Sequence, residues 1–429
     1  MNLLPFSPWL EWLACLLVVG LAVFGGKNRG LSAVVLMAIL IISWVFGTAT
    51  WFLVPLALGG VIWLLMERLK NPWCLLGKCA AIGGAVGTVL LCWLFPVPEA
   101  PPLTGKYQVG TFALEIPAAG ESPRLMAQVW YPADHVGGIP VPWLPDRGLA
   151  PALPYHRLVF AHAHARLDVP VAEIHGPLPV VFYEHSWMGH RFENIAQVES
   201  LASEGFVIIA VDHPGQAERV LYPDGSVVKG RYAEPLDFSS PKAVAGFSAD
   251  AGKCFTERLK NLERTRQALA GSMVKNLAGR LKLDHVGIFG FSFGGSTAIR
   301  ACAENPAFVA GANEDGLFLG EQMPRGAFLF FDQEMPAWLE AAPKPGEDAG
   351  QVLTRHAETQ IQIALKQPHR DRLILDGTRH LSFSDRIFAS PIPRLARVGT
   401  RPQEEVHEIV CKRLGEFFKA ELSSPEKPE

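Results

Sequence analysis

The stretch Val286-Gly287-Ile288-Phe289-Gly290-Phe291-Ser292-Phe293-Gly294-Gly295 decides the fold of this chain. Its first four residues have the composition of a short buried strand, and the run Ser296–Ala303 behind it has the small-residue composition of a helix. Between the two lies the pattern G-x-S-x-G, with Ser292 at its centre. A strand that turns sharply into a helix strains the backbone of the central serine and exposes its hydroxyl. The pattern in this context predicts that Ser292 is a nucleophile.

The composition of the chain argues against several classes of function. The 429 residues carry a net charge of −3, so there is no basic excess to recommend nucleic acid as a partner. None of the seven cysteines has C-x-x-C spacing with another, so neither a disulfide framework nor a zinc–cysteine site is expected. Hydrophobic residues make up 49% of the chain, and the excess is concentrated at its start.

Residues 1–96 have the pattern of a transmembrane module of about four helices. The run Leu31–Met66 contains no ionisable side chain, and as one helix it would be about 54 Å long, against about 30 Å for a hydrocarbon core. It is therefore expected to form two spans, with a turn at Gly47–Thr50. Trp9–Phe24 and Cys79–Phe95 are further apolar stretches. A signal peptide at residues 1–25 is disfavoured because it lacks a basic start, and the remaining alternative is a hydrophobic helical subdomain on a soluble enzyme.

The positive charges between these stretches predict the orientation. Lys27 and Arg29 lie in one connection, and Arg68, Lys70 and Lys78 lie in another. The positive-inside rule places both connections in the cytoplasm. Residues 105–429 then lie on the extracytoplasmic side of a plasma or inner membrane, after a proline-rich linker at 97–104 that suits an extended spacer.

Residues 105–429 alternate between strand and helix patterns. This alternation predicts an α/β fold with a mostly parallel sheet and helices on both faces. The expected strands are Thr111–Ile116 and Leu125–Trp130 as a hairpin, then Pro179–Tyr183, Phe206–Val211, Val286–Phe289, Phe308–Ala312, Ala327–Phe331 and Arg372–Leu375, and the expected helices are Asn194–Ser203, Ala249–Ala270, Ser296–Ala303 and Gln403–Leu422.

This segment resembles an α/β-hydrolase, and more specifically the plasma-type platelet-activating-factor acetylhydrolases and their bacterial relatives. The likeness covers most of residues 105–390 and none of the apolar module. It rests on the stretches Phe182–Gly189, Leu201–Phe206, Val211–His213, Leu283–Gly295, Asn313–Gly316 and Gly377–Asp385. Ser186 departs from the family pattern, because a glycine usually follows the loop histidine.

A serine nucleophile needs an imidazole to accept its proton and a carboxylate to orient that imidazole. In this fold the chain order is Ser, acid, His, so only histidines well after Ser292 qualify. His380 follows a predicted strand in a loop that begins with glycine, and it is the expected base. His356, His369 and His407 are expected to be solvated surface residues.

Two carboxylates compete for the acid. Asp315 follows the strand at Phe308–Ala312, and Asp332 follows the next strand. Many α/β-hydrolases use the later position, which favours Asp332, whereas the resemblance implies Asp315. Asp315 is the prediction, and Asp332 is the alternative.

The oxyanion formed in acyl transfer needs preorganised N–H donors. The backbone N–H of Phe293, directly after the nucleophile, is one expected donor. The resemblance implies that the other is the N–H of Trp187, with His185 as loop scaffolding. His162, His164 and His175 could suggest a metal site, but nothing in the pattern calls for one, so no metal and no cofactor is expected.

Together these residues predict a membrane-anchored serine esterase. The resemblance implies short-acyl or oxidised phospholipid esters, or related carboxylic esters, as substrates. Acyl transfer to another acceptor would use the same acyl-enzyme and stays an alternative, as does a catalytically silent membrane sensor or scaffold. The segment Pro140–Pro154 is a candidate rim of the pocket. The sequence gives no indication of the oligomeric state.

Overall fold

The computed structural model describes residues 9–24, 34, 38, 51–66, 69–134, 137–149, 155–271, 277–342 and 346–422. The chain forms two compact units. The first contains Met1–Pro98 with Ala150–Ala161 and Ala389–Ile392, and the second contains Glu99–Leu149, His162–Phe388 and Pro393–Glu429.

The first unit is helical. Its elements are α1 (Trp9–Phe24), η1 (Trp51–Leu53), α3 (Val54–Met66), α4 (Trp73–Leu94) and η3 (Tyr155–Phe160). The backbones of α3 and α4 approach closely, because a Cβ at Gly59 would lie 2.3 Å from the carbonyl oxygen of Ala80. The hydroxyl of Thr88, near the end of α4, donates to the carbonyl oxygen of Phe52 in η1 at 2.8 Å, directly before α3 begins.

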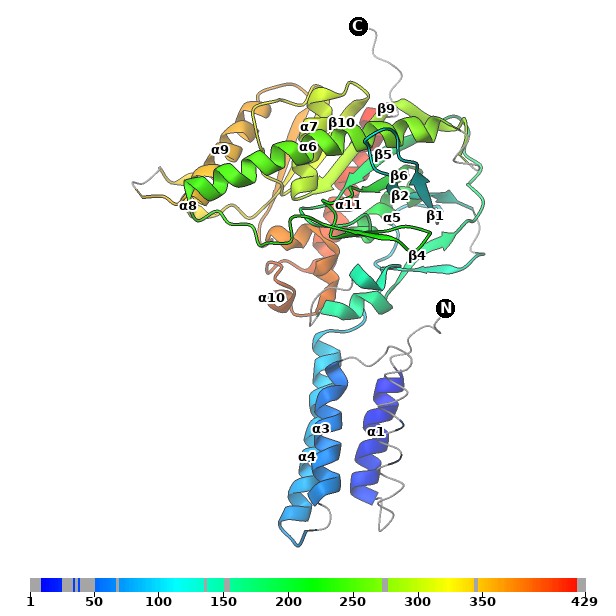
Figure 1. The fold of residues 1–429 in the computed structure, drawn as a ribbon, viewed down its shortest axis with the longest axis vertical. Coiled ribbons are helices and arrows are strands. Elements are labelled where there is room, and N and C mark those ends of the chain that lie inside the picture. The colour runs from blue at the N-terminus through cyan, green and yellow to red at the C-terminus, as the bar shows by residue number, and fades with distance from the viewer. Residues whose placement is uncertain are drawn as a thin grey trace. The chain divides into compact units, whose positions relative to one another are not determined.

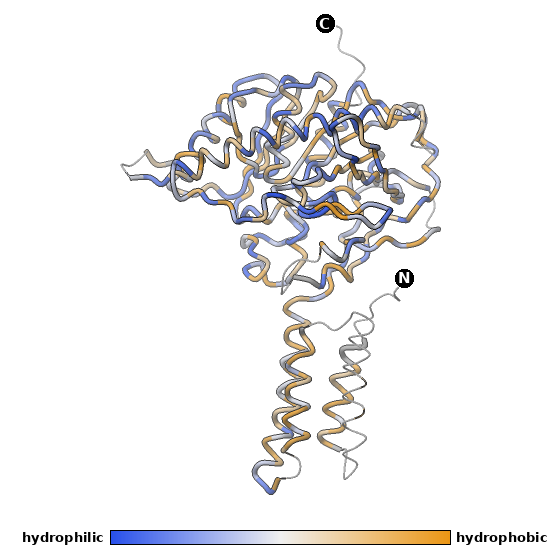
Figure 2. Tube along the Cα trace, in the orientation of Figure 1, coloured by the Kyte–Doolittle hydropathy of each residue, from blue (hydrophilic) through white to orange (hydrophobic). Residues whose placement is uncertain are grey.

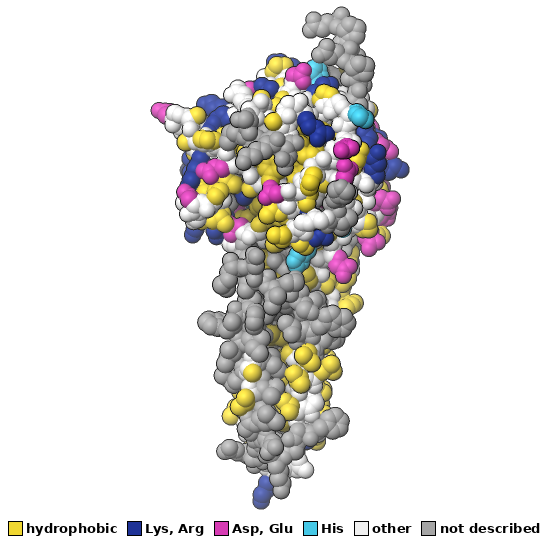
Figure 3. All heavy atoms as spheres, turned by 90° about the vertical axis from the view of Figure 1, so that its right-hand side faces the viewer, with side chains coloured by type: hydrophobic (Ala, Val, Ile, Leu, Met, Phe, Trp, Pro, Cys, Tyr) yellow, Lys and Arg dark blue, Asp and Glu magenta, His cyan; other side chains and the backbone are white. Residues whose placement is uncertain are grey.

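The first unit exposes apolar side chains on its helices. Leu65 is 71% exposed and Leu16 is 69% exposed. Figure 2 colours most of α3 and α4 as hydrophobic, and Figure 3 shows hydrophobic side chains on the described part of this unit. Among the described residues, α4 is the one helix long and apolar enough to cross a membrane, whereas Leu13–Val23 and Val54–Met66 are shorter apolar helices.

Among the described residues, one helix of spanning length therefore stands where the sequence predicts a transmembrane module of about four helices. The predicted turn Gly47–Thr50 lies outside the described residues, as do Lys27, Arg29 and Arg68. The described part of the predicted two-span hairpin forms η1 and α3, and Val34 and Ala38 are also helical.

The second unit is built on a ten-stranded sheet in the order β12-β11-β10-β9-β5-β6-β2-β1-β4-β3 (Figure 1). From β12 to β6 every neighbouring pair is parallel, and β2 and β1 continue the sheet as an antiparallel hairpin. The central strands are continuous apolar runs because helices cover both of their faces. The strands are β1 (Gln108–Ile116), β2 (Leu125–Ala133), β3 (Pro140–Pro142), β4 (His162–Leu167), β5 (Leu178–Glu184), β6 (Val207–Asp212), β9 (Leu281–Phe291), β10 (Phe308–Glu314), β11 (Ala327–Gln333) and β12 (Arg370–Leu375), with a separate ribbon of β7 (Arg219–Leu221) and β8 (Val227–Lys229).

The helices of this unit form two groups against the sheet. One group is α6 (Pro241–Ala270), which contacts α7 (Phe293–Glu304) and α9 (Ala349–Ala364), and the other is α5 (Ile195–Ser203), which contacts α11 (Gln403–Leu422) (Figure 1). This arrangement confirms the predicted mostly parallel sheet with helices. The short elements are η2 (Arg147–Leu149), α8 (Ala337–Glu340), η4 (His380–Phe383), η5 (Asp385–Ala389) and α10 (Pro393–Ala396).

Helix α6 and strand β9 extend furthest beyond the ranges that the sequence pattern indicates. Helix α6 begins eight residues before the predicted Ala249, since Ser240 caps its start by accepting from the backbone N–H of Ala243 and Pro241 occupies the first turn. Strand β9 begins at Leu281, where it pairs with Leu178 of β5. Both extensions depend on end contacts that hydrophobic periodicity does not report.

Candidate active site

Ser292 stands at the junction of β9 and α7 with φ +57° and ψ −121°. A non-glycine residue with positive φ is strained and must be held by its surroundings. Here the N–H of Ser292 donates to the carbonyl oxygen of Glu314 at 2.8 Å, and its carbonyl oxygen accepts from the N–H of Ser296 at 3.2 Å. The predicted strand–turn–helix context of this serine is confirmed.

The glycines around Ser292 are required by close backbone contacts. A Cβ at Gly294 would lie 1.9 Å from the carbonyl oxygen of Glu184, and one at Gly290 would lie 2.4 Å from the carbonyl carbon of Gly294. A Cβ at Gly316 would lie 2.0 Å from the carbonyl oxygen of Ser292. Since the atoms in the way belong to the backbone, no side-chain movement could make room for a larger residue.

The structure brings the predicted serine, acid and histidine together. His380, at the start of η4, has its Nε2 3.0 Å from Ser292 Oγ and its Nδ1 2.6 Å from Asp315 Oδ2. Asp315 directly follows β10 with φ +55°, which is a second strained backbone position. A hydroxyl, an imidazole and a carboxylate in this order can pass the hydroxyl proton to the imidazole while the carboxylate holds the ring.

The alternative acid, Asp332, has a different partner. Its Oδ2 accepts from the Nε of Arg372 at 2.8 Å. Burial raises the pKa of Asp332 to about 7, and the positive charge of Arg372 opposes that rise. Asp332 lines the same cavity as His380 but forms an ion pair there instead of a contact with the imidazole.

Gln333 is a site residue that the sequence analysis missed. Its backbone N–H donates to Asp315 Oδ1 at 2.9 Å, and its Nε2 donates to Asp315 Oδ2 at 3.1 Å. Its Oε1 accepts from the backbone N–H of His380 at 3.0 Å. One amide side chain therefore holds both the acid and the histidine, yet no sequence motif marks it.

The other late histidines lie elsewhere. His356 on α9 and His369 before β12 are exposed, as expected. The expectation was wrong for His407, which is only 6% exposed on α11 and has its ring nitrogens 3.6 Å from Cys411 Sγ. Burial lowers the pKa of His407 to about 4.

Trp187 and Phe293, whose N–H groups are the expected oxyanion donors, both line the cavity next to Ser292. Their rings meet edge to face with centroids 4.9 Å apart. Ser186 stands where the resemblance leads one to expect glycine, and both of its donors bind Glu193: the N–H donates to Oε2 at 2.7 Å and the hydroxyl to Oε1 at 2.5 Å. The extra hydroxyl thus anchors the loop.

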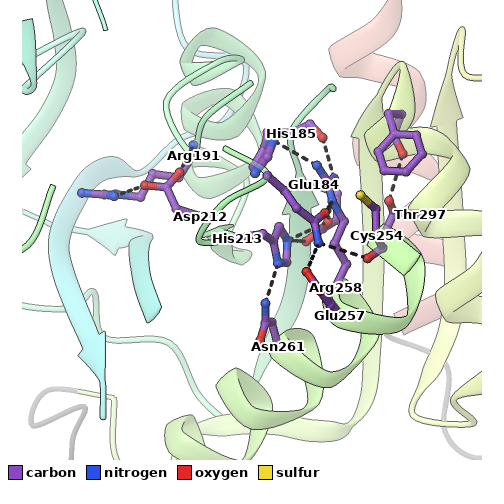
Figure 4. Close-up of polar contacts among 12 residues, drawn as sticks. Glu184, His185, Arg191, Asp212, His213, Cys254, Glu257, Arg258, Asn261 and Thr297 are labelled. Atoms are coloured by element: carbon purple, nitrogen blue, oxygen red, sulfur yellow. Dashed lines mark hydrogen bonds and ion pairs between the residues drawn. The ribbon is translucent and has the colours of Figure 1, made fainter. Parts of the chain in front are cut away.

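Arg258 of α6 supports this loop from the protein interior (Figure 4). Its guanidinium donates to the carbonyl oxygens of His185 at 2.8 Å and Ser186 at 3.3 Å, and it pairs with Glu184 at 3.2 Å. Because the C=O and N–H of one trans peptide point in opposite directions, holding the Ser186 carbonyl toward Arg258 turns the N–H of Trp187 away from it. Arg258 is only 1% exposed.

Further buried polar groups complete this support. His213 Nε2 lies 3.0 Å from Glu184, and its Nδ1 lies 3.2 Å from Asn261 Nδ2 (Figure 4). Burial raises the pKa of Glu184 to about 8 and lowers the pKa values of His185 and His213 well below the usual range, so both rings are neutral. Sequence reasoning missed Arg258, although its position three residues after Phe255 and four before Leu262 puts it on the apolar stripe of α6.

Ser292 and His380 open into a cavity of about 510 Å³. The segment Pro140–Pro154, predicted as its rim, contributes none of the lining among its described residues, because its Trp143 is buried and donates to Asp385 at 2.7 Å. The walls come mainly from the segment that precedes α6, from the first half of α6, from the connection between β11 and α9, and from α9 itself. The apolar lining residues are Trp187, Leu236, Phe238, Phe247, Phe293, Leu317, Leu319, Met335, Pro336, Trp338, Leu339, Ala357 and Ile361.

The histidines that could suggest a metal lie away from this cavity. His162 and His164 belong to β4, and His164 Nε2 is 2.9 Å from the carbonyl oxygen of Pro101. Within the described part of the chain, no group of three or more His, Cys, Asp or Glu side chains could hold a metal ion.

Comparison with known proteins supports the hydrolase fold. Residues 164–314 match the dienelactone hydrolase family, a stretch that contains Ser292 and ends one residue before Asp315. A ferulic acid esterase from Streptomyces cinnamoneus superposes with a TM-score of 0.58 at 22% identity, covering 77% of this chain and 95% of that one. The finer resemblance to platelet-activating-factor acetylhydrolases stays a prediction. With the sheet order, these matches assign the second unit to the α/β-hydrolase fold.

Proposed function

We propose that this chain is a serine esterase that hydrolyses carboxylic esters through an acyl intermediate on Ser292. The observation that carries the proposal is the contact chain from Ser292 Oγ to His380 Nε2 at 3.0 Å and from His380 Nδ1 to Asp315 Oδ2 at 2.6 Å. This chain opens into a cavity large enough for a small ester.

In the first half of the reaction, Ser292 Oγ attacks the ester carbonyl while His380 Nε2 takes the hydroxyl proton. Asp315 holds the Nδ1–H and stabilises the imidazolium. The oxyanion accepts hydrogen bonds from the N–H groups of Phe293 and Trp187. The tetrahedral intermediate then collapses, and His380 returns the proton to the departing alcohol.

In the second half, water takes the place of the alcohol. His380 Nε2 removes a proton from the water as its oxygen attacks the acyl carbon. Collapse of this second intermediate breaks the bond to Ser292 Oγ, which recovers its proton from His380. The acid leaves, and the enzyme returns to its starting state.

The proposed substrates are esters with short or oxidised acyl groups, including phospholipid-like esters. The resemblance supports this class, and so does a cavity whose walls are mainly aromatic and aliphatic. A bilayer offers such substrates to an enzyme anchored beside it.

We further propose that the first unit anchors the protein in a plasma or inner membrane, with the catalytic unit on the extracytoplasmic side. The length of α4 and the exposed apolar side chains of α1, α3 and α4 support anchoring, and the basic connections support the orientation. The full chain should stay in the membrane pellet after an alkaline wash and leave it in detergent. A carboxyl-terminal tag should be open to protease added from outside the cell, and recovery of the full chain in the soluble fraction would contradict anchoring.

A fluorophosphonate probe tests the catalytic proposal, because it labels only an activated serine. The wild type should be labelled, and Ser292→Ala should abolish both the labelling and the hydrolysis of p-nitrophenyl butyrate. Ser226→Ala, at an exposed serine between β7 and β8 that does not line the cavity, serves as the control. A folded wild type that takes up no label would reject the esterase and acyltransferase readings alike. A series of p-nitrophenyl esters and short sn-2 phospholipids then tests the substrate class, which activity on long acyl chains alone would contradict.

A further inference from the structure

One wall of the cavity carries charges that the proposed hydrolysis does not use. Asp332 in β11, Arg372 in β12 and Glu358 on α9 all line the cavity that also holds Ser292 and His380. Their side chains are 11%, 8% and 21% exposed, so water screens them little.

The two carboxylates occupy the guanidinium of Arg372. Nε donates to Asp332 at 2.8 Å, and Nη1 and Nη2 donate to the two oxygens of Glu358 at 2.7 and 2.8 Å. Nη2 also lies 3.6 Å from Met335 Sδ. A guanidinium held in this forked manner by Glu358 has little left to offer a third anion.

The charge balance of this wall is neutral or negative. With all three groups ionised, two carboxylates surround one guanidinium. Burial raises the pKa of Asp332 to about 7, so near neutral pH its carboxyl moves between a charged and an uncharged form, and neither form leaves a positive excess. Among the described residues that line the cavity, Arg372 is the only lysine or arginine. A substrate anion here would lose its hydration without gaining a free cation.

We propose that Asp332, Glu358 and Arg372 make this cavity selective against esters that place an anionic group on its wall, with Glu358 as the specificity-determining residue. Neutral acyl groups fit the surrounding apolar side chains, and cationic groups meet a wall without positive excess. Replacing Glu358 with glutamine removes one negative charge and one of the two acceptor oxygens, so an N–H of Arg372 loses its partner and the wall becomes a site for a carboxylate. The inference rests on the proposed esterase activity.

The test compares two esters of similar size, p-nitrophenyl butyrate and the p-nitrophenyl monoester of succinate. In the wild type we expect kcat/KM for butyrate to exceed that for succinate by at least about tenfold, a difference of about 1.4 kcal/mol. In Glu358→Gln this ratio should fall at least about fivefold, mainly through a lower KM for succinate. Adding Arg372→Met to Glu358→Gln should restore it. Glu416→Gln, on the exposed surface of α11, is the matched control for the same chemical change.

Two results would overturn the inference: a wild type that hydrolyses both esters equally well, or a ratio that stays fixed in Glu358→Gln. If Glu358→Gln fails to fold, Asp332→Asn is the second variant, because it removes the negative charge that pairs with Arg372 Nε, and the same ratio is measured. Fluorophosphonate labelling of each variant separates the two proposals. A wild type without label removes the esterase proposal itself, whereas labelled variants with an unchanged ratio remove only the selectivity.

Discussion

Arg258 donates from Nη1 to the carbonyl oxygen of His185 at 2.8 Å, which fixes the start of the loop that carries Trp187. The same guanidinium reaches the carbonyl oxygen of Ser186 and the carboxylate of Glu184. It therefore sets the directions of two successive peptide groups beneath the proposed oxyanion hole. Arg258 is a positioning residue, since its effect on the substrate passes through this backbone.

Arg258→Met should lower kcat by about 10²-fold, the usual cost of losing one oxyanion donor, while KM changes less than about threefold. The reason is that a shifted Trp187 N–H weakens binding of the transition state more than binding of the ester. Arg264→Met on the same helix is the control, because Arg264 donates instead to Pro117 and Pro123. Steady-state kinetics on the folded variant decide the matter, and an unchanged kcat would refute the positioning role.

Asp315→Asn should reduce kcat by about 10⁴-fold, because an amide cannot hold the imidazole in the required tautomer or stabilise its cation. Asp332→Asn should cost far less with a neutral ester, since Asp332 pairs with Arg372. The same esterase assay on both variants compares them directly. A larger loss in Asp332→Asn would make Asp332 the acid.

Gln333→Ala should lower kcat by about tenfold. It removes one donor to Asp315 and the acceptor for the backbone N–H of His380, and both catalytic groups then gain freedom. Gln322→Ala, whose side chain binds Arg300 at the surface, is the matched control. If kcat stays at the wild-type value while the fold is intact, Gln333 has no positioning role.

Glu199→Gln should flatten the dependence of stability on pH. Glu199 is 1% exposed and accepts from the backbone N–H groups of His164 and Ala165, and burial raises its pKa to about 7. In the unfolded chain this carboxyl has its ordinary pKa of 4.5. Between pH 4.5 and pH 7 the native state therefore binds more protons than the unfolded state. The free energy of unfolding contributed by this group therefore falls as pH rises.

We expect the wild type to lose up to about 3 kcal/mol relative to Glu199→Gln between pH 5 and pH 8. Unfolding of the detergent-solubilised full chain across this pH range measures the difference. Glu416→Gln controls for loss of an exposed carboxylate. A constant gap between the wild type and Glu199→Gln at all pH values would refute the assignment.

The nucleophile was predictable because its constraints are local. Gly290, Ser292 and Gly294 lie within five residues, and the flanking strand and helix patterns are short-range signals. The acid had two candidates, Asp315 as the prediction and Asp332 as the alternative, because Asp315 follows β10 and Asp332 lies at the end of the neighbouring parallel strand β11. What distinguishes them is the ion pair of Asp332 with Arg372, which forms across β11 and β12 and leaves no local trace.

Gln333 and Arg258 escaped prediction for a different reason. Their partners include backbone groups, and any residue sequence can supply a carbonyl oxygen or an N–H. His407 was more accessible to reasoning from the sequence. With Cys411, Leu414 and Phe418 it forms the helical spacing of a buried face on α11, so its assignment to the surface was an error of periodicity.

Helix α6 carries Phe247, which lines the cavity, and Arg258, which supports the loop of Trp187. Eleven residues separate them, about 16 Å along one continuous rod. In the proposed mechanism, the cavity wall that contacts the acyl group and the residue that supports the oxyanion loop therefore lie on one helix. In that mechanism, a bulky acyl group that displaces Phe247 would also displace the helix that supports the Trp187 loop, so acyl fit and turnover would change together. A change of ester specificity would then require compensating changes near both Phe247 and Arg258.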